Sequence, residues 1–397
     1  MTGHKSGQNG GGKPHVALAL QGGAAFGPYQ LGCYRAMTEK GFEPEWISGI
    51  SIGAVGATIL AGNPPDKRLQ QLEKFWEIVT RPSAWWDAWL YNLSPTVFIK
   101  MSGLQTQLTG QPHFFSPRIP PIPQISPPGT PDALSYADAS PLRQTLLELA
   151  DFDYINSKHA PRLSLGVTKV TTGELKFFDN RERKLTPEHT LASGALPPGF
   201  APVVIDGEQY WDGGVASNTP LQTFLDNPVN GSLLIFMVDL FSATGPELKT
   251  MDDVMFREAQ IRYASRVQRE IRNTTRRWNS RRMLVELLRQ APQAHQAEFR
   301  QIFGDVPGTR MGTGSEPDQI HDLDIIHVSY QPGPGIPPEA GHEFSRISVK
   351  NRCDAGYTDM LHAIQGSPWI SRKKTALQGA CVHHCQGGHI HTRTHLG

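Results

Sequence analysis

The chain has 397 residues, 38% of them hydrophobic, so it is long enough to bury a sizeable core in one large domain or two ordinary ones. Its 38 basic residues nearly balance its 37 acidic ones, and the formal charge of +1 gives no general attraction to nucleic acid or to an anionic membrane. The Gly-rich residues 1–14 lack the apolar segment of a secretory signal, and no stretch is apolar enough to span a membrane.

Two strand and helix pairs begin the predicted fold. Residues 15–20 are an apolar run followed by a Gly-rich turn, which predicts a buried strand. A helix should follow and end at Gly41. Residues 46–50 predict a second strand, and the small apolar residues 52–61 predict a helix packed closely on a sheet. This order is typical of a parallel sheet covered by helices on both faces.

The middle of the chain interrupts this pattern. Residues 65–79 have apolar side chains on one helical face and predict an amphipathic helix outside the sheet. Residues 81–135 are rich in Trp and include a Pro-rich tract that cannot form a regular helix, so we interpret them as an insertion or cap. A helix over 140–150 and a β-hairpin over 163–178 are expected next.

The C-terminal part combines strands with a long helical segment. Residues 232–240 and 325–328 predict strands. Between them, residues 252–303 have helical propensity and are dense in Arg, which favours a solvated helix pair; the alternative is a basic face that meets anionic lipid headgroups. Residues 371–397 contain Cys and His without periodicity, and we expect them to be disordered and to hold no metal, although zinc binding is the alternative.

The candidate nucleophile is Ser51. It lies in Gly49-Ile-Ser-Ile-Gly53, which matches the G-x-S-x-G turn that lifts a serine oxygen clear of a sheet, with glycines on both sides to avoid clashes. The motif follows a predicted strand and opens a predicted helix, which is the context it requires. The helix N-terminus and the N–H of Ile52 could then stabilise an oxyanion. A serine in an ordinary loop is the alternative.

The loop at residues 21–27, Gln-Gly-Gly-Ala-Ala-Phe-Gly, should lie beside Ser51, because the ends of adjacent parallel strands face the same crevice. Consecutive small residues expose backbone N–H groups, so Gly22, Gly23 and Ala24 could bind an oxyanion. A dinucleotide-binding loop is disfavoured, because the spacing is G-G-x-x-x-G and the second strand lacks a terminal acidic residue.

The candidate base is Asp212. It precedes Gly213 and Gly214 in a sequence suited to a tight turn with the carboxylate at its tip, although such a sequence is most often only a turn. Residues 218–221, Asn-Thr-Pro-Leu, predict an N-cap and the first turn of a helix. Asp212 should therefore lie on a rigid loop that can reach Ser51.

In this combination of motifs, the sequence resembles the patatin-like phospholipase family over residues 16–369. The resemblance includes residues 192–200, and it implies a three-layer α/β/α fold with a mainly parallel central sheet and a helical C-terminal region. It also implies a Ser-Asp dyad of Ser51 and Asp212. The implied oxyanion hole comprises Gly22, Gly23 and Ala24, to which the helix N-terminus adds Ile52. The glycines that support these motifs are Gly27, Gly49, Gly53, Gly213 and Gly214.

The first loop departs from many members of the family. They have a third glycine and an arginine where this chain has Ala24 and Phe26. The N–H of Ala24 can still donate, but arginine-based stabilisation of the loop cannot be assumed. The loop is similar to that of a bacterial branch that has an additional C-terminal region.

The expected organisation has four parts. They are a disordered tail over 1–14, a catalytic core over 15–245 with an insertion at about 81–135, a helical region over 246–370 packed on the core, and a tail over 371–397. Four scattered cysteines indicate reduced thiols in a cytoplasmic protein, which a transient membrane contact could make peripheral. We expect a lipid or ester substrate, no cofactor, no metal and no nucleic acid; the sequence sets no oligomeric state.

The expected activity is that of a serine acyl hydrolase of the lipase, esterase or phospholipase A type. Two alternatives remain open. One is a Ser-Asp-His triad, with the histidine drawn from His295, His321, His327, His342 and His362. The other is a non-catalytic lipid-binding protein of the same fold.

Overall fold

The computed structural model describes residues 13–119, 123–227, 231–303, 321–372 and 379–393. Its main sheet contains β1 (His15–Leu20), β2 (Trp46–Gly49), β5 (Arg162–Lys169), β6 (Leu175–Asp179), β7 (Val203–Ile205), β8 (Glu208–Asp212), β9 (Leu233–Asp239), β10 (Leu323–Ser329), β11 (Ala380–Gln386) and β12 (His389–Arg393). The order is β12-β11-β10-β9-β1-β2-β5-β8-β7, and β6 pairs with β5. The strands from β11 to β5 are parallel, whereas β6, β7, β8 and β12 pair antiparallel.

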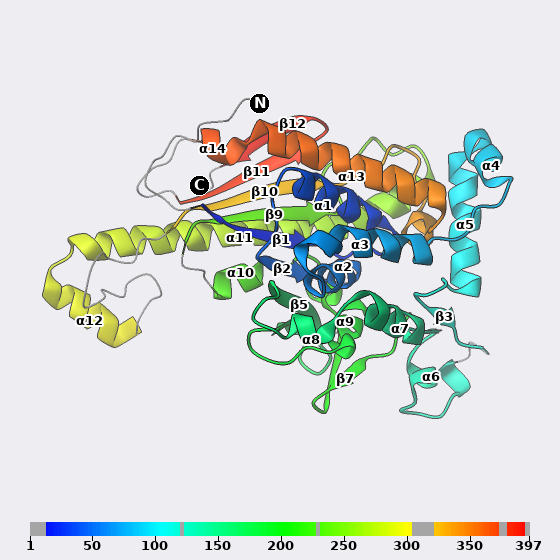
Figure 1. Cartoon of the computed structure of the whole chain (residues 1–397), viewed down its shortest axis with the longest axis horizontal. Coiled ribbons are helices and arrows are strands. Elements are labelled where there is room, and N and C mark those ends of the chain that lie inside the picture. The colour runs from blue at the N-terminus through cyan, green and yellow to red at the C-terminus, as the bar shows by residue number, and fades with distance from the viewer. Residues whose placement is uncertain (1–12, 120–122, 228–230, 304–320, 373–378, 394–397) are drawn as a thin grey trace.

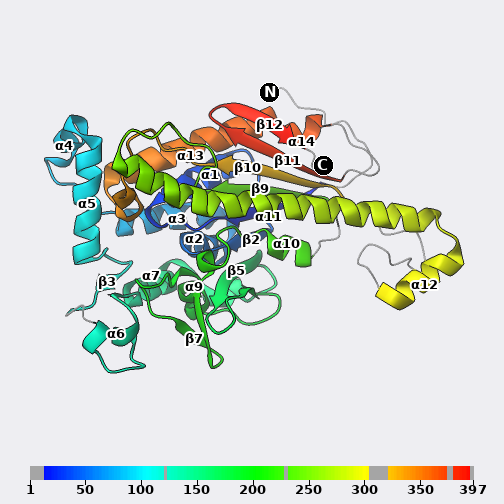
Figure 2. The ribbon, with the colours of Figure 1, turned by 180° about the vertical axis from the view of Figure 1, so that it is seen from behind.

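Helices cover both faces of this sheet, as Figures 1 and 2 show from opposite sides. The helices are α1 (Pro28–Glu39), α2 (Ile52–Ala61), α3 (Pro65–Val79), α4 (Asp87–Leu93), α5 (Pro95–Thr109), α6 (Pro131–Leu134), α7 (Ser140–Leu149), α8 (Phe152–Ile155), α9 (Pro187–Gly194), α10 (Gln222–Asp226), α11 (Met251–Gln290), α12 (Gln293–Phe303), α13 (Arg346–Gly366) and α14 (Pro368–Ser371). Short 3-10 turns are η1 (Ala24–Phe26), η2 (Pro123–Ile125), η3 (Gly213–Val215) and η4 (Pro338–His342). The predicted three-layer fold with a mainly parallel sheet and a helical C-terminal region is confirmed.

Alternate residues of the strands face two separate cores. On β9, Phe236 packs into the core that α1, α2, α3 and α13 share, whereas Ile235 packs into the core on the other face. α11 supplies Val267, Ile271 and Trp278 to that second core. This alternation is what a sheet buried on both faces requires.

α11 differs from the solvated helix that its arginines led us to expect. It is a helix of 40 residues that lies across the back of the sheet (Figure 2). Ala264, Val267, Ile271 and Trp278 are buried, and their spacing of three, four and seven residues keeps them on one helical face. The high density of Arg on the other faces hid this apolar stripe.

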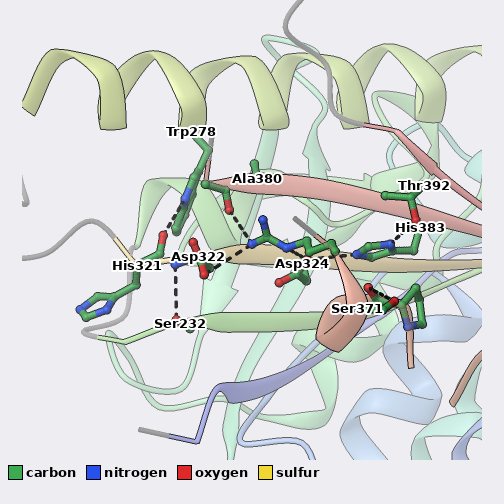
Figure 3. Close-up of polar contacts among 12 residues, drawn as sticks. Ser232, Trp278, His321, Asp322, Asp324, Ser371, Ala380, His383 and Thr392 are labelled. Carbon is green, nitrogen blue, oxygen red and sulfur yellow. Dashed lines mark hydrogen bonds and ion pairs between the residues drawn. The ribbon is translucent and has the colours of Figure 1, made fainter. Parts of the chain in front are cut away.

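The expectation of disorder after residue 371 is wrong for residues 379–393, which include β11 and β12. β11 pairs in parallel with β10, and its buried His383 contacts Asp324 at 3.0 Å and Thr392 at 2.8 Å (Figure 3). Asp324 also forms an ion pair with Arg372 at 2.6 Å. Polar side chains can therefore occupy core positions here, because partners from distant segments satisfy them. Residues 373–378 and 394–397 lie outside the described residues, as do 1–12 of the predicted N-terminal tail.

The segment interpreted as an insertion contains α4, α5 and α6, and the first two of these helices project at one end of the molecule (Figure 1). α5 is attached to η4: a Cβ atom added at Gly103 would lie 2.5 Å from the carbonyl oxygen of Glu339. Part of the Pro-rich tract, residues 120–122, lies outside the described residues. The short strands β3 (Ser116–Pro117) and β4 (Ala137–Asp138) pair separately from the main sheet.

α1 and α13 approach each other so closely that their backbones touch. A Cβ atom at Gly356 would lie 2.0 Å from the carbonyl oxygen of Tyr29, and one at Gly32 would lie 1.9 Å from that of Cys353. Only glycine permits this approach. Because α1 begins directly after the Gly-rich loop of residues 21–27, α13 fixes the position of the segment that follows that loop.

We expect Gly356→Ala to lower the free energy of unfolding by about 3 kcal/mol, since the added methyl group would force two helix backbones apart. Urea unfolding followed by circular dichroism measures the change. Gly333→Ala is the matched control, because a Cβ atom there meets nothing within 4 Å. Equal stability of the two variants would contradict the close approach of α1 and α13.

Candidate active site

Ser51 lies in a strained turn between β2 and α2. Its φ is 57°, in the left-handed region that a residue with a side chain seldom adopts. A Cβ atom at Gly49 would lie 2.3 Å from the carbonyl oxygen of Gly53, and one at Gly53 would lie equally close, at 2.3 Å, to that of Leu20. The two glycines are therefore required by sterics, as the G-x-S-x-G pattern predicts.

Asp212 ends β8 and lies against Ser51. Its carboxylate accepts a hydrogen bond from the N–H of Gly214 at 2.7 Å, and the Ser51 side chain lies close enough to lower its pKa as a hydrogen-bond donor. Only 1% of the residue is exposed. The two residues, distant in sequence, are in direct contact, and a carboxylate in this position can accept the proton of the hydroxyl group.

Burial raises the pKa of Asp212 to about 7, and the hydrogen bonds from Ser51 and Gly214 act in the opposite direction. Desolvation is the larger effect because it removes the water that would stabilise the charged carboxylate. A carboxyl group with this pKa is a much stronger base than one in water, yet it is still largely ionised at slightly alkaline pH.

Residues 192–200, which also carry the family resemblance, join the two sides of the site. The N–H of Ser51 donates to the carbonyl oxygen of Ser193 at 3.1 Å and to its hydroxyl oxygen at 3.2 Å. The Ser193 hydroxyl in turn donates to the carbonyl oxygen of Gly166 at 2.6 Å. The N–H of Asp212 donates to the carbonyl oxygen of Ala195 at 3.0 Å. One segment thus holds the backbones of Ser51 and Asp212.

The Gly-rich loop meets Ser51 as expected. A Cβ atom at Gly22 would lie 2.9 Å from that of Ser51. Within the described parts of the chain, the N–H groups of Gly23, Ala24 and Ile52 donate to no protein acceptor. These three groups are therefore available to a negatively charged oxygen. Ala24 has a φ of 47°, so this loop, like the turn at Ser51, contains a non-glycine residue in the left-handed region.

Gly22 differs from the other candidate donors because Asn218 engages its peptide groups. The N–H of Gly22 donates to the backbone oxygen of Asn218 at 3.4 Å, and the Asn218 side chain donates to the Gly22 oxygen at 2.9 Å. The prediction that Asn218 is an N-cap is wrong, since α10 begins at Gln222. Asn218 instead joins the Gly-rich loop to the loop after Asp212, a role that no sequence signal indicated.

α11 holds the loop after Asp212 from its other side. Arg266 donates to the carbonyl oxygen of Val215 at 3.0 Å, and Ser217 donates to the carboxylate of Glu270 at 2.7 Å. Burial raises the pKa of Glu270 to about 7. The sequence showed an arginine-rich helix, but it could not indicate which of its polar residues face this loop.

The histidines considered for a triad lie in several elements. His327 of β10 contacts Asp239 at 2.7 Å and His384 at 2.9 Å, inside the sheet. His295 lies in α12, His342 ends η4, His362 lies in α13, and His321 precedes β10. Among the described residues, the groups that shift the pKa of Asp212 besides its burial are Ser51 and Gly214. None of these histidines is among them.

Two further features bear on ligands and membranes. Among the described residues, no group of three or more His, Cys, Asp or Glu side chains is arranged to hold a metal ion. The described helices also include none with both the length and the apolar character needed to cross a bilayer.

Comparisons with known proteins give two family matches. A family model described as patatin-like phospholipase matches residues 18–225, and one described as patatin phospholipase matches residues 261–376. A comparison with curated protein sequences gives no match.

Solved structures to which the chain is similar include VipD, a cytosolic phospholipase A2 and ExoU. VipD from Legionella pneumophila is 15% identical, with 90% of this chain and 68% of that chain covered and a TM-score of 0.37. Human GIVD cytosolic phospholipase A2 in complex with a fluorophosphonate inhibitor is 12% identical, with 56% and 40% covered and a TM-score of 0.32. ExoU, in its complex with SpcU from Pseudomonas aeruginosa, is 18% identical, with 66% and 52% covered and a TM-score of 0.27.

The raised pKa of Asp212 predicts a pH-dependent effect of Asp212→Asn on stability. Because the folded-state pKa of about 7 exceeds the ordinary value of 3.8, the wild type loses stability as pH rises from about 4 to 7. Asparagine carries no charge and can still accept the hydrogen bond from Gly214. We expect the variant to be more stable than the wild type at pH 8, by up to about 4 kcal/mol, and the difference to shrink toward pH 4.

Urea unfolding of both proteins at pH 5, 7 and 8 measures this difference. Glu270 titrates over the same range but is present in both proteins, so its contribution cancels. A variant that is less stable than the wild type at pH 8 would contradict the desolvation of Asp212.

Proposed function

Because the chain belongs to the patatin-like phospholipase family, we propose that it is a serine acyl hydrolase that cleaves carboxylic esters of lipids through an acyl intermediate on Ser51. The observation that carries this proposal is the direct contact of the Ser51 hydroxyl with the buried carboxylate of Asp212. The adjacent N–H groups, which have no acceptor among the described residues, supply the second requirement of acyl transfer, a place for a negatively charged oxygen.

The reaction has two steps. Asp212 accepts the proton of the Ser51 hydroxyl as its oxygen attacks the ester carbonyl, and the N–H groups of Gly23, Ala24 and Ile52 donate to the oxyanion. The carbon–oxygen bond to the alcohol then breaks, and Asp212 returns the proton to the leaving oxygen. In the second step Asp212 deprotonates a water molecule that attacks the acyl group, and the proton returns to Ser51.

A Ser-Asp dyad is favoured over a triad by the contact between the two residues. In a triad the histidine stands between the serine and the acid, and the acid only orients it. Here Ser51 itself is the side chain that acts on the carboxylate of Asp212. His327, which follows in the chain order that a triad requires, already pairs with Asp239.

A non-catalytic lipid-binding role is disfavoured by the strained turn at Ser51. A φ of 57° at a serine costs energy that a binding protein has no reason to retain.

We predict that Ser51→Ala and Asp212→Asn each lower kcat for ester hydrolysis by at least about a thousandfold, because each removes one member of the proton-transfer pair. In the wild type, kcat/KM should rise with pH up to about 7 and then level off, as the carboxylate of Asp212 ionises. A series of nitrophenyl esters and phospholipids of increasing acyl length measures both effects and defines the preferred substrate.

The controls separate the alternatives. Labelling by a fluorophosphonate probe should occur in the wild type and disappear in Ser51→Ala. Alanine variants of His295, His321, His327, His342 and His362 should keep their activity, whereas a triad requires one of them to be inactive. Retention of most activity by Asp212→Asn would remove that residue from the mechanism.

We also infer that the protein contacts a lipid surface through an exposed apolar ridge. The ridge is formed by α4, α5 and the residues before α4. Its members are Trp85, Trp86, Trp89, Leu93, Val97, Met101, Leu104 and Leu108. Trp85 is 87% exposed and Leu108 is 68% exposed. The α5 members recur every three or four residues and so form one stripe, and a contiguous exposed apolar surface of this kind marks an interaction site.

Three features favour lipid as the partner of this ridge. It projects from the body of the protein (Figure 1), a convex shape suited to insertion into the boundary of a bilayer. Tryptophan is the side chain most suited to that boundary, since its ring is apolar and its N–H is polar. α5 also packs on η4, and a Cβ atom at Gly341 in η4 would lie 4.0 Å from Phe26 of the Gly-rich loop, so the ridge is close to the site.

We predict that the triple variant Trp85→Ser, Trp89→Ser, Leu104→Ser binds neutral phosphatidylcholine vesicles at least about tenfold more weakly, because three apolar side chains no longer leave water. Its kcat for a short soluble ester should stay within about twofold of the wild type. Leu147→Ser, Leu287→Ser, Ile370→Ser is the matched control, since these residues are exposed elsewhere. Vesicle sedimentation measures the binding. Equal binding by the two triple variants would exclude the ridge as the lipid contact.

A further inference from the structure

Arg352 of α13 reaches across the molecule to the Gly-rich loop. It is 4% exposed, and its guanidinium group donates to the carbonyl oxygen of Ala25 at 2.6 Å. The same group donates to the carbonyl oxygens of Glu343 at 2.9 Å and Ala340 at 3.1 Å. One buried cation therefore connects the loop beside Ser51 to the segment that contains η4.

The guanidinium group also lies over a side chain of the loop itself. Its central carbon is 4.9 Å from the centre of the Phe26 ring, a distance typical of a cation–π interaction. The opposite charge comes from Glu343, whose fully buried carboxylate is 3.7 Å from Arg352 and also accepts a hydrogen bond from Ser102 of α5 at 3.0 Å. These contacts hold the guanidinium group in one orientation.

The loop needs such a restraint because its conformation is not the one its sequence prefers. Ala24 has a φ of 47°, which costs an alanine about 1 kcal/mol. The oxygen of the peptide group between Ala25 and Phe26 points to Arg352, and the N–H of this planar group, that of Phe26, donates to the carbonyl oxygen of Gly23 at 3.0 Å. The Gly23 carbonyl shares its own planar peptide group with the N–H of Ala24, so holding the Ala25 oxygen restricts the direction of that N–H group.

We propose that Arg352 is a positioning residue for the reaction: by holding the Ala25 carbonyl oxygen and the Phe26 ring, it aims the N–H groups of the Gly-rich loop at the oxyanion. This inference rests on the proposed function, since it assigns these N–H groups to the transition state. It also gives the C-terminal region a direct part in the site, because Arg352 lies within residues 261–376, which match a separate family model.

The other role available to Arg352 is a purely structural one, in which it only attaches α13 to the rest of the protein. The two roles predict different kinetics. A structural residue affects the amount of folded protein, whereas a positioning residue affects the oxyanion and therefore kcat, with little change in KM. Arg68 of α3 offers a matched control, as it is also 4% exposed, donates to the carbonyl oxygen of Asn63 at 3.1 Å and pairs with Glu43 at 3.0 Å.

The test compares Arg352→Lys with Arg68→Lys in the full-length protein. Lysine keeps the charge but cannot reproduce the several directed hydrogen bonds of a guanidinium group. We expect Arg352→Lys to lower kcat for a short soluble ester by about tenfold or more while KM changes by less than about threefold. Arg68→Lys should keep kcat within about twofold of the wild type, even if its melting temperature falls as far as that of Arg352→Lys.

Hydrogen exchange supplies a readout that does not require activity. We expect the backbone amides of residues 22–27 to exchange faster in Arg352→Lys than in the wild type or Arg68→Lys. Phe26→Leu, which removes the ring but keeps an apolar side chain, should show the same changes to a smaller extent. Phe26→Leu therefore still tests the restraint of the loop if Arg352→Lys does not fold.

The outcomes separate this inference from the proposed function. If the wild type has no Ser51-dependent esterase activity, the proposed function fails, and the exchange experiment alone tests the restraint of the loop. If the wild type is active, an unchanged kcat in Arg352→Lys or a loss confined to KM overturns the positioning role. Equal kcat losses in the Arg352 and Arg68 variants would overturn it as well.

Discussion

The removal of one carboxyl group from water is the constraint on which the site depends. Asp212 is buried against Ser51, and burial brings its pKa to about 7, whereas a carboxylate in water would be a poor base for a hydroxyl group. This desolvation costs stability, so the surrounding structure must hold the residue in place. The N–H of Asp212 is held by Ala195, and its carboxylate by Gly214 and Ser51.

The C-terminal region contributes to this structure from both faces of the sheet. α13 lies on one face and sends Arg352 to the Gly-rich loop, while α11 lies on the other and sends Arg266 to the loop after Asp212. β10 and β11 extend the same sheet that carries Ser51. The region is therefore continuous with the core, and the loops on the two sides of the site are each held by an arginine from it.

The contacts around Glu343 connect the apolar ridge to the Gly-rich loop. Ser102, on the helix that carries part of the ridge, donates to Glu343, which pairs with Arg352, which in turn donates to the carbonyl oxygen of Ala25. The surface proposed to meet lipid and the groups proposed to bind the oxyanion are thus connected by a continuous series of polar contacts. In the proposed function, where the substrate leaves a lipid surface to reach Ser51, these contacts would keep the ridge and the loop in a fixed relation.

The sequence by itself determined the features that depend on near neighbours along the chain. The apolar runs and helical periodicities located β1, α2 and α3, and the glycines around Ser51 and after Asp212 marked the two turns, because the steric demands of a tight turn fall on adjacent residues. The family resemblance added the pairing of these two turns.

Only the tertiary structure decided which distant polar groups meet. Asn218 binds Gly22 and His383 lies in the core beside Asp324, although local sequence indicated a helix cap and a disordered tail. Arg352, which binds Ala25, was marked by no sequence motif. The physical reason is the same in each case. A polar side chain can be buried when a partner satisfies it, and here that partner lies far away in the sequence, where no local pattern records it.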